Sequence, residues 1–551
     1  MSTGGHETSA ADARSELVGM FGSITIAWSV SGREVGFVTG FDSGFEVGGF
    51  AVATTPAGTR LLLQIHDLQL RERNAVQVEL DTDEIGGGSS PVRSAQVGLA
   101  LRVVTGSGQV LAEVGPDGVR PFDPIGFSEG SLEPAPDSLV AQLVQHSLGS
   151  AVGLPIGRSG ASGGAALVKA SGFSRHTFLV GQSGSGKTYA LGVILERLLV
   201  HTSLPLIIID PNSDYVHLGA LLPREKVAMR GRPPMTEPVY AALGEAMAAS
   251  GAVRVASAHG GDLPLRIHFS DLSLAEQALT LGLDSLRDPD EYSAFMDVVE
   301  EVPAAGNYSV DRLVDLLQRH DDQWSHRLLQ RIRNLRVAGW QVWARSSEPS
   351  LVSLLQDERA VVLDTGSLEE ARERSAIALA VLGHLRRREQ RTPVLLVVDE
   401  AHNLLAPNGD DALQRAVTDY GVWIAGEGRK YGVHMLVSTQ RPQKVHRNIL
   451  SQCDNLVLMR MNSKGDIEEL GAVFSHVPQP MIEEAKSFRQ GEMLVAGPIS
   501  ATPLRVHTAE RWCPEGGADL PTTWASGGAL ATDVITASSD LQPQPTKGEQ
   551  R

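Results

Sequence analysis

A glycine-rich loop at residues 181–188 has the composition needed to bind a phosphate chain. It reads GQSGSGKT, follows an apolar run at 177–180, and precedes an amphipathic helical pattern. Glycines let the backbone turn its N–H groups toward phosphate oxygens at the start of a helix, where Lys187 would reach the β and γ phosphates and Thr188 would hold Mg²⁺. The sequence therefore predicts a nucleoside triphosphate site with Mg²⁺. Its predicted residues are Gly181, Gln182, Ser183, Gly184, Ser185, Gly186, Lys187 and Thr188.

Two adjacent carboxylates end a second apolar run. Residues 394–398 read VLLVV, and Asp399 and Glu400 follow directly. Ligands of open α/β sheets sit at the carboxyl ends of the strands, so both side chains are expected beside the phosphate loop. There Asp399 would order the Mg²⁺ shell, and Glu400 would orient the attacking water. An acidic pair of this kind indicates hydrolysis rather than binding alone.

A third group of polar residues surrounds the run at 433–438. Arg429 precedes this run and Gln440 follows it. A guanidinium can stabilise charge on a transferring γ-phosphoryl group, and an amide can sense or position that group. From spacing alone, a solvated loop followed by a strand cap is an equally good interpretation.

Strand-like and helical runs alternate over most of the chain. Apolar runs at 206–210, 360–364, 394–398, 433–438 and 456–461 are separated by helical patterns, which is typical of a parallel α/β sheet. Residues 22 to about 114 instead contain short β-type runs broken by Gly, Pro and Asp turns, which predict a small barrel or sandwich. The expected organisation is a disordered N-terminus at 1–20, a small β-barrel with its linker at 21–150, an ATPase core at 151–220 and 356–510, a helical insertion at 221–355 and a tail at 511–551.

Composition excludes several classes of protein. There are 65 acidic and 48 basic residues, a net charge of −17, so bulk attraction to nucleic acid is not expected and any DNA contact must be local. Only Cys453 and Cys513 occur, which excludes a disulfide framework or a cysteine metal site. No apolar run reaches the roughly 20 residues of a membrane span and no signal peptide is evident, so we expect a cytoplasmic protein without membrane association.

These motifs together resemble the HerA-type ATPases of the FtsK/HerA group of RecA-like motors. The resemblance covers about residues 150–500 and follows the family's order and spacing. The matching segments are RHTFLVGQSGSGKT, LIIIDPNSDY, LLVVDEAHNL, GRKYGVHMLVSTQRP, ILSQCDNLVLMRMNSKGD and FRQGEMLVAG. The resemblance implies a RecA-like core with an N-terminal small β-barrel and an inserted helical bundle.

The family resemblance also implies roles for further residues. Arg429 matches the arginine finger that acts on the neighbouring subunit's nucleotide, and Gln440 matches the polar sensor. Arg460 matches another arginine of the family, whose action in cis or in trans stays open. Asp210 and Asp214 resemble the family's Asp-Pro motif, although Ser213-Asp214 replaces the commoner Gly-Glu. Lys187, Glu400, Arg429, Gln440 and Arg460 are the predicted catalytic residues.

Two functions are open at this point. One, which the resemblance implies, is a homo-hexameric ring that uses ATP to move double-stranded DNA, working as a translocase or helicase with a NurA-like nuclease in end processing. The other is an ATPase ring that scaffolds and activates an effector enzyme in antiphage defence. The predicted DNA contacts are Arg441, Lys444 and Arg447. The run Arg386 to Arg388 is interpreted mainly as a solvated helix face, with DNA contact as the alternative.

Overall fold

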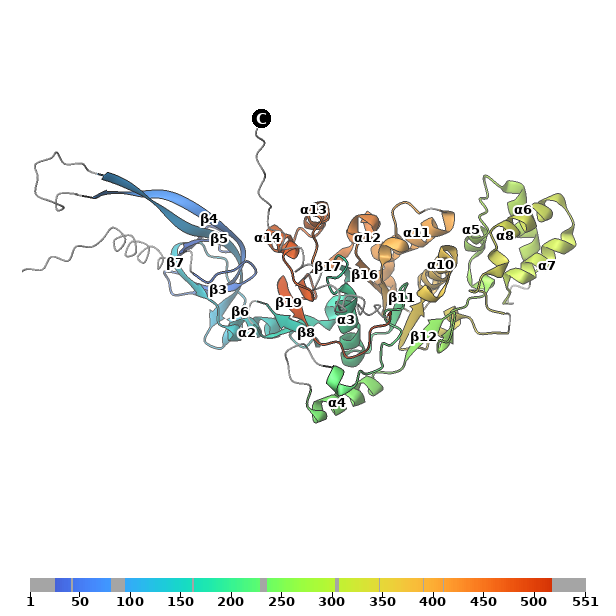
Figure 1. Cartoon of the computed structure of the whole chain (residues 1–551), viewed down its shortest axis with the longest axis horizontal. Coiled ribbons are helices and arrows are strands. Elements are labelled where there is room, and N and C mark those ends of the chain that lie inside the picture. The colour runs from blue at the N-terminus through green and yellow to red at the C-terminus, as the bar shows by residue number, and fades with distance from the viewer. Residues whose placement is uncertain are drawn as a thin grey trace, which may run out of the picture.

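The computed structural model describes residues 25–40, 43–80, 95–160, 163–227, 235–302, 307–345, 347–389, 391–409 and 411–517. These residues form a barrel, a large central sheet with helices on both faces, and a helical group at the end opposite the barrel (Figure 1). The predicted disordered N-terminus lies outside the described residues, as do residues 518–551 of the predicted tail.

The N-terminal strands close into a six-stranded barrel in the order β2-β1-β7-β3-β4-β5, with β5 returning to β2 and β6 attached to β5. The barrel encloses its own apolar core, which includes Phe37, Leu63 and Ile65. Strands β4 and β5 continue as a long hairpin away from the barrel (Figure 1). The strands are β1 (Ile26–Ser29), β2 (Glu34–Thr39), β3 (Phe50–Thr54), β4 (Arg60–Leu80), β5 (Ala95–Gly115), β6 (Gly118–Arg120) and β7 (Phe127–Pro134).

The central sheet has the order β13-β12-β14-β11-β15-β16-β10-β17-β18-β19-β8-β9. The strands from β13 to β17 are parallel, and the remaining strands are antiparallel. The predicted α/β fold with a RecA-like parallel core and an N-terminal barrel is therefore confirmed. The strands are β8 (Gly153–Ser159), β9 (Ala165–Lys169), β10 (His176–Val180), β11 (Leu206–Asp210), β12 (Val253–Ser257), β13 (Leu263–Pro264), β14 (Ala360–Asp364), β15 (Val394–Val398), β16 (Val433–Thr439), β17 (Cys453–Met459), β18 (Glu492–Ala496) and β19 (Leu504–Thr508).

Both faces of the central parallel strands β11 and β15 are buried, so these two strands are almost entirely apolar. In β11, Leu206 and Ile208 join the core formed with α3, whereas Ile207 and Ile209 join the core formed with α10 and α11. The helices are α2 (Asp137–Leu148), α3 (Lys187–His201), α4 (Glu237–Ala249), α5 (Leu274–Thr280), α6 (Pro289–Glu300), α7 (Val310–His320), α8 (Gln323–Asn334), α9 (Leu351–Leu354), α10 (Ala371–Arg387), α11 (Ala412–Glu427), α12 (Arg447–Leu450), α13 (Lys464–Val473) and α14 (Gln479–Glu483).

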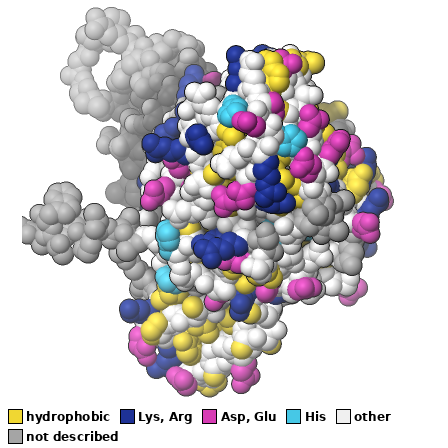
Figure 2. All heavy atoms as spheres, turned by 90° about the vertical axis from the view of Figure 1, so that its right-hand side faces the viewer, with side chains coloured by type: hydrophobic (Ala, Val, Ile, Leu, Met, Phe, Trp, Pro, Cys, Tyr) yellow, Lys and Arg dark blue, Asp and Glu magenta, His cyan; other side chains and the backbone are white. Residues whose placement is uncertain are grey.

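Residues 221–355, expected to form a helical insertion, also contribute two strands to the sheet. Helices α5 to α8 pack at one end of the molecule, but β12 pairs with β14 and β13 pairs with β12. On the face shown in Figure 2, basic and acidic side chains are interspersed. Among the helices that the structure describes, none combines the length and apolar character that crossing a bilayer requires.

Residues 511–517, expected to belong to a tail, are packed against the core. Trp512 and Cys513 are buried with residues of α4, and the buried Glu196 of α3 accepts both of their backbone N–H groups. Cys453 and Cys513 are both free thiols. Burial raises the pKa of Cys513 to about 12, so this thiol is protonated and unreactive at neutral pH.

Candidate active site

The phosphate loop connects the buried strand β10 to the first turn of α3. Gly184 and Gly186 have φ angles of +72° and +95°, in the left-handed region that glycine occupies without steric cost. The loop is held in place because Gln182 N–H donates to the carbonyl of Arg460 (3.0 Å) and Gly491 N–H donates to that of Ser185 (2.9 Å). The buried Ser185 Oγ has no hydrogen-bond partner within the described residues. A fixed turn with an unpaired, buried Ser185 hydroxyl is suited to binding a phosphate group.

Lys187 lies between the two carboxylates that end β15. Its Nζ is 2.8 Å from Asp399 Oδ1 and 3.0 Å from Glu400 Oε1, and all three side chains are almost fully buried. Burial by itself would lower the pKa of Lys187, but the two carboxylates outweigh it and raise that pKa above its ordinary value. Lys187 is therefore a fixed positive charge at the carboxyl edge of the sheet.

Glu400 has a strained backbone and a defined side-chain position. Its φ of +42° is in the left-handed region, which a residue with a Cβ rarely adopts and which is frequently found at functional sites. Gln440 follows β16 and donates from Nε2 to Glu400 Oε1 at 2.7 Å, and His402 Nδ1 lies 3.2 Å from Oε2. Four predicted site residues therefore meet at one point: Lys187, Asp399, Glu400 and Gln440.

The two predicted arginines lie at opposite edges of the parallel sheet. Arg460 follows β17 and donates from Nη2 to the carbonyl of Gly184 (3.2 Å), so it contacts the phosphate loop of its own chain. Arg429 precedes β16, whereas Gln440 follows it, and a seven-residue strand spans roughly 23 Å. Arg429 is thus remote from Lys187 in the same chain.

Arg429 is half-exposed and pairs with Asp454, whose carboxylate lies 3.5 Å from Arg429 and 3.1 Å from Arg175. Neither Arg175 nor Asp454 belongs to the residues that the sequence motifs mark as functional. Both flank the apolar strands that carried the motifs, and strand order alone could have placed them beside Arg429.

A cavity of about 750 Å³ opens beside the phosphate loop and is bounded on one side by residues near the end of the described chain. Glu515, Gly516 and Gly517 line it together with Lys187 and Thr188. Sequence reasoning missed these C-terminal residues, because nothing in the segment RWCPEGG marks it as part of a site. The cavity is large enough for a nucleotide.

Asp210, the last residue of β11, and Asp214, which follows the strand, are acidic residues that also approach this site. The buried carboxylate of Asp210 accepts backbone N–H groups from Asn212, Asp214 and Tyr215. Tyr215 is fully buried, and its hydroxyl donates to Asp399 Oδ2 over 3.5 Å. Burial, aided by nearby negative charge, raises the pKa of Asp210 to about 7 and that of Asp214 to about 6.

The predicted DNA contacts Arg441, Lys444 and Arg447 are exposed and follow Gln440 in sequence. Arg386 and Arg387 are exposed, in keeping with the expected solvated helix face, but all three arginines of the run 386–388 also make internal contacts. Arg386 stacks on Tyr420 and Trp423, Arg387 pairs with Glu276, and Arg388 donates to two backbone carbonyls. These three guanidinium groups are occupied by internal contacts.

The phosphate loop on a RecA-like sheet defines the class of protein as a P-loop NTPase fold. Residues 154–385 match the family model described as the central domain of the helicase HerA. Over these residues the chain is similar to the HerA helicase family, as the sequence motifs indicated.

Individual relatives are distant. The chain is 31% identical to the DNA double-strand break repair helicase HerA of Sulfurisphaera tokodaii over 114 residues, which are 21% of this chain and 22% of that protein. It is 22% identical to the protein of the same name from Pyrococcus furiosus over 378 residues, 60% of this chain and 65% of that one. The chain thus spans less than two thirds of these relatives' length. Among solved structures, VirB4 of Thermoanaerobacter pseudethanolicus is 18% identical with a TM-score of 0.43, over 68% of this chain and 98% of that one.

Proposed function

We propose that this chain is an ATP-dependent DNA translocase or helicase that acts as a homo-hexameric ring on duplex DNA. The observation that carries the proposal is the contact of Lys187 with Asp399 and Glu400 beside a preformed phosphate loop. Such a constellation is suited to hydrolysis of the β–γ bond of ATP. The relatives named as DNA double-strand break repair helicases support DNA as the substrate of the motor.

The residues of the site fit ATP and Mg²⁺. Lys187 would bind the β and γ phosphates, and the loop amides would bind their oxygens. Thr188 and Asp399 would hold Mg²⁺, which when bound neutralises phosphate charge. Glu400 would accept a hydrogen bond from water and orient it toward the γ-phosphorus, while Gln440 holds the Glu400 carboxylate in place.

The separation of Arg429 from Lys187 supports catalysis between subunits. In a ring, the edge of the sheet that carries Arg429 would face the phosphate loop of the next subunit, where the guanidinium would stabilise charge on the γ-phosphoryl oxygens. The contact of Arg460 with Gly184 of its own loop supports a role in cis. A single chain would then bind ATP but hydrolyse it slowly.

DNA binding would be local and independent of base sequence. The exposed cations Arg441, Lys444 and Arg447 follow Gln440 in sequence. A short segment of chain would therefore connect DNA phosphates bound by these cations to the ATP site. A NurA-like nuclease, or a defence effector, is the partner we propose for this motor.

The test is the steady-state ATPase rate of the purified chain with and without linear duplex DNA, with its mass in solution measured in parallel. A hexamer whose rate rises strongly with DNA, and which is inactive as Glu400→Gln, is the expected result. A rate indifferent to DNA, with activity appearing only when an effector is added, would refute the translocase and favour an effector scaffold.

A further inference from the structure

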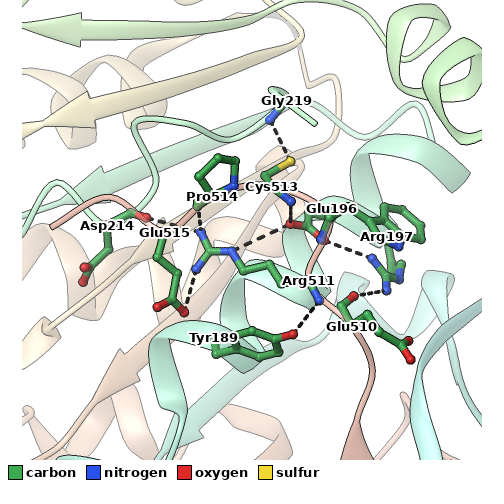
Figure 3. Close-up of polar contacts among 11 residues, drawn as sticks. Tyr189, Glu196, Arg197, Asp214, Gly219, Glu510, Arg511, Cys513, Pro514 and Glu515 are labelled. Atoms are coloured by element: carbon green, nitrogen blue, oxygen red, sulfur yellow. Dashed lines mark hydrogen bonds and ion pairs between the residues drawn. The ribbon is translucent and has the colours of Figure 1, made fainter. Parts of the chain in front are cut away.

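The segment that follows β19 runs along α3 and ends at the nucleotide cavity. Ala509 N–H donates to the carbonyl of Ile156, and Leu222 N–H donates to that of Trp512, both at 2.8 Å. The backbone N–H of Arg511 donates to the hydroxyl of Tyr189, the residue after Thr188 (2.7 Å). The segment is therefore tied to the first turn of the phosphate-loop helix (Figure 3).

Buried charges fix this segment to α3. Arg511 is 1% exposed, lies 3.7 Å from the fully buried Glu196, and donates to the carbonyls of Asp214 and Pro514. Arg197 stacks on Trp512, with its guanidinium carbon 3.3 Å from the ring centroid. A Cβ at position 192 would lie 2.6 Å from the Arg511 guanidinium, so α3 carries glycine where the arginine crosses it. Such a contact holds the segment in one place.

The last described residues reach the cavity. Gly516 N–H donates to the carbonyl of Asp214 at 3.0 Å, and a Cβ on Gly516 would lie 1.7 Å from the carbonyl oxygen of Ser213. Glu515 receives a hydrogen bond from Arg511 at 3.2 Å, and its side chain is half-exposed. Glu515, Gly516 and Gly517 line the same cavity as Lys187 and Thr188.

We propose that residues 515–517 form the wall of the site on the nucleoside side, and that Glu515 binds the ribose hydroxyls. This inference rests on the proposed ATP site. It assigns a specificity-determining residue to that site, and it makes the C-terminal segment part of nucleotide recognition.

The chemistry of a carboxylate supports the ribose, rather than the phosphates, as the group that Glu515 binds. An ionised carboxylate only accepts hydrogen bonds, as do the phosphate oxygens, so Glu515 and the triphosphate repel each other. The ribose 2′ and 3′ hydroxyls are the paired donors nearest to the phosphates, and a carboxylate can accept both. Arg511 engages Oε1 of Glu515 and orients the carboxylate, which has capacity for further donors.

The direct test compares the affinities of ADP and 2′-deoxyADP for the full chain by calorimetry, since neither is hydrolysed. A hydrogen bond to a charged group corresponds to roughly tenfold or more in affinity, so the wild type should prefer ADP by about that factor. Glu515→Gln should weaken the binding of ADP and reduce the preference for ADP over 2′-deoxyADP to about threefold or less. Glu510→Gln, in the same segment but outside the cavity lining, should keep the preference.

A backbone test does not depend on the carboxylate. Gly516→Ala forces the segment away from Ser213, so it should weaken ADP binding, whereas Gly339→Ala, which meets nothing within 4 Å, should not. A chain ending after Gly517 should bind ADP like the full chain, and one ending after Cys513 should bind it at least about tenfold more weakly.

Two failures can be told apart. Equal affinities for ADP and 2′-deoxyADP in the wild type, or an unchanged preference in Glu515→Gln, would overturn the ribose assignment while leaving the ATP site intact. Absence of ADP and ATP binding to the wild-type chain would overturn the proposed function itself.

Discussion

The Nζ of Lys187 lies 2.8 Å from Oδ1 of Asp399, with both side chains almost completely shielded from water. Glu400 shares the same ammonium group, so one positive charge compensates two buried negative charges. Phosphates entering the loop would compete for Lys187, and a bound Mg²⁺ would replace its charge at the carboxylates.

Replacing Lys187 should affect both nucleotide binding and folding stability. Lys187→Met removes the phosphate ligand and leaves buried carboxylates uncompensated, and removal of one partner of a buried pair costs about 3–5 kcal/mol. We expect loss of ADP binding in calorimetry and a lower free energy of unfolding in urea. Lys464→Met, at an exposed ion pair of α13, should change neither quantity. Unaltered stability of Lys187→Met would mean that the buried contact is not formed in solution.

Glu400 and Gln440 should affect turnover more than binding. Glu400→Gln removes the acceptor for the attacking water, so phosphate release should slow by about 10²–10⁴-fold while labelled ATP is retained on filters. Gln440→Ala removes the 2.7 Å hydrogen bond to Glu400, and it should lower kcat with little change in the Kd for ADP. If Gln440→Ala raised that Kd without lowering kcat, its role would be in binding.

Arg429 should act on another subunit's nucleotide. Arg429→Ala should bind ADP normally and hydrolyse ATP poorly, and Lys187→Ala should be inactive because it binds no nucleotide. Mixing the two inactive variants creates interfaces that combine an intact phosphate loop with an intact Arg429. Recovery of ATPase activity on mixing is the expected result, measured after dissociation and reassembly. If the mixture were as inactive as each variant alone, Arg429 would not be the residue that acts on the neighbouring subunit's nucleotide.

The parts of the site that sequence could predict are those built from contiguous residues. The phosphate loop, Asp399 and Glu400 each follow an apolar strand directly, so strand order and local motif together place them at one edge. Gln440 also follows its strand, and its contact with Glu400 emerges from the pairing of β15 with β16.

What sequence could not predict depends on distant contacts. The Trp512 N–H donates a hydrogen bond to Glu196, which lies 316 positions earlier in the sequence. No local pattern in this Gly- and Pro-containing segment indicates that hydrogen bond. Strand β12 was missed because its five residues include Arg254 and are only partly buried, which weakens the apolar signal. The run Arg386 to Arg388 was interpreted by charge alone, whereas its aromatic and carboxylate partners come from other elements.

Asp210 should make stability depend on pH in the acid range. Burial, opposed by hydrogen bonds from Tyr215 and Asp214, raises the pKa of Asp210 from 3.8 to about 7 in the folded chain. Between these values the folded state binds the proton more tightly than the unfolded state, so this group's contribution to stability falls as pH rises from about 4 to about 7. Asp210→Asn should therefore shrink the difference in Tm between pH 5 and pH 7.5. Asp117→Asn, at an exposed turn, should retain the wild-type difference, and an identical difference in Asp210→Asn would show that Asp210 ionises normally.

The exposed cations after β16 should carry the response to DNA. Replacing Arg441, Lys444 and Arg447 together by alanine should remove most of the stimulation of ATPase activity by linear duplex DNA, because phosphate contacts supply most sequence-independent affinity. The slope of log affinity against log salt should become shallower by about 0.9 for each phosphate that is no longer neutralised, measured by fluorescence anisotropy at several salt concentrations. The matched control is Arg312→Ala with Arg319→Ala, two exposed arginines of α7 at the far end of the molecule. Equal salt slopes for the triple variant and the wild type would move the DNA contact to another surface, since the number of phosphates neutralised would be unchanged.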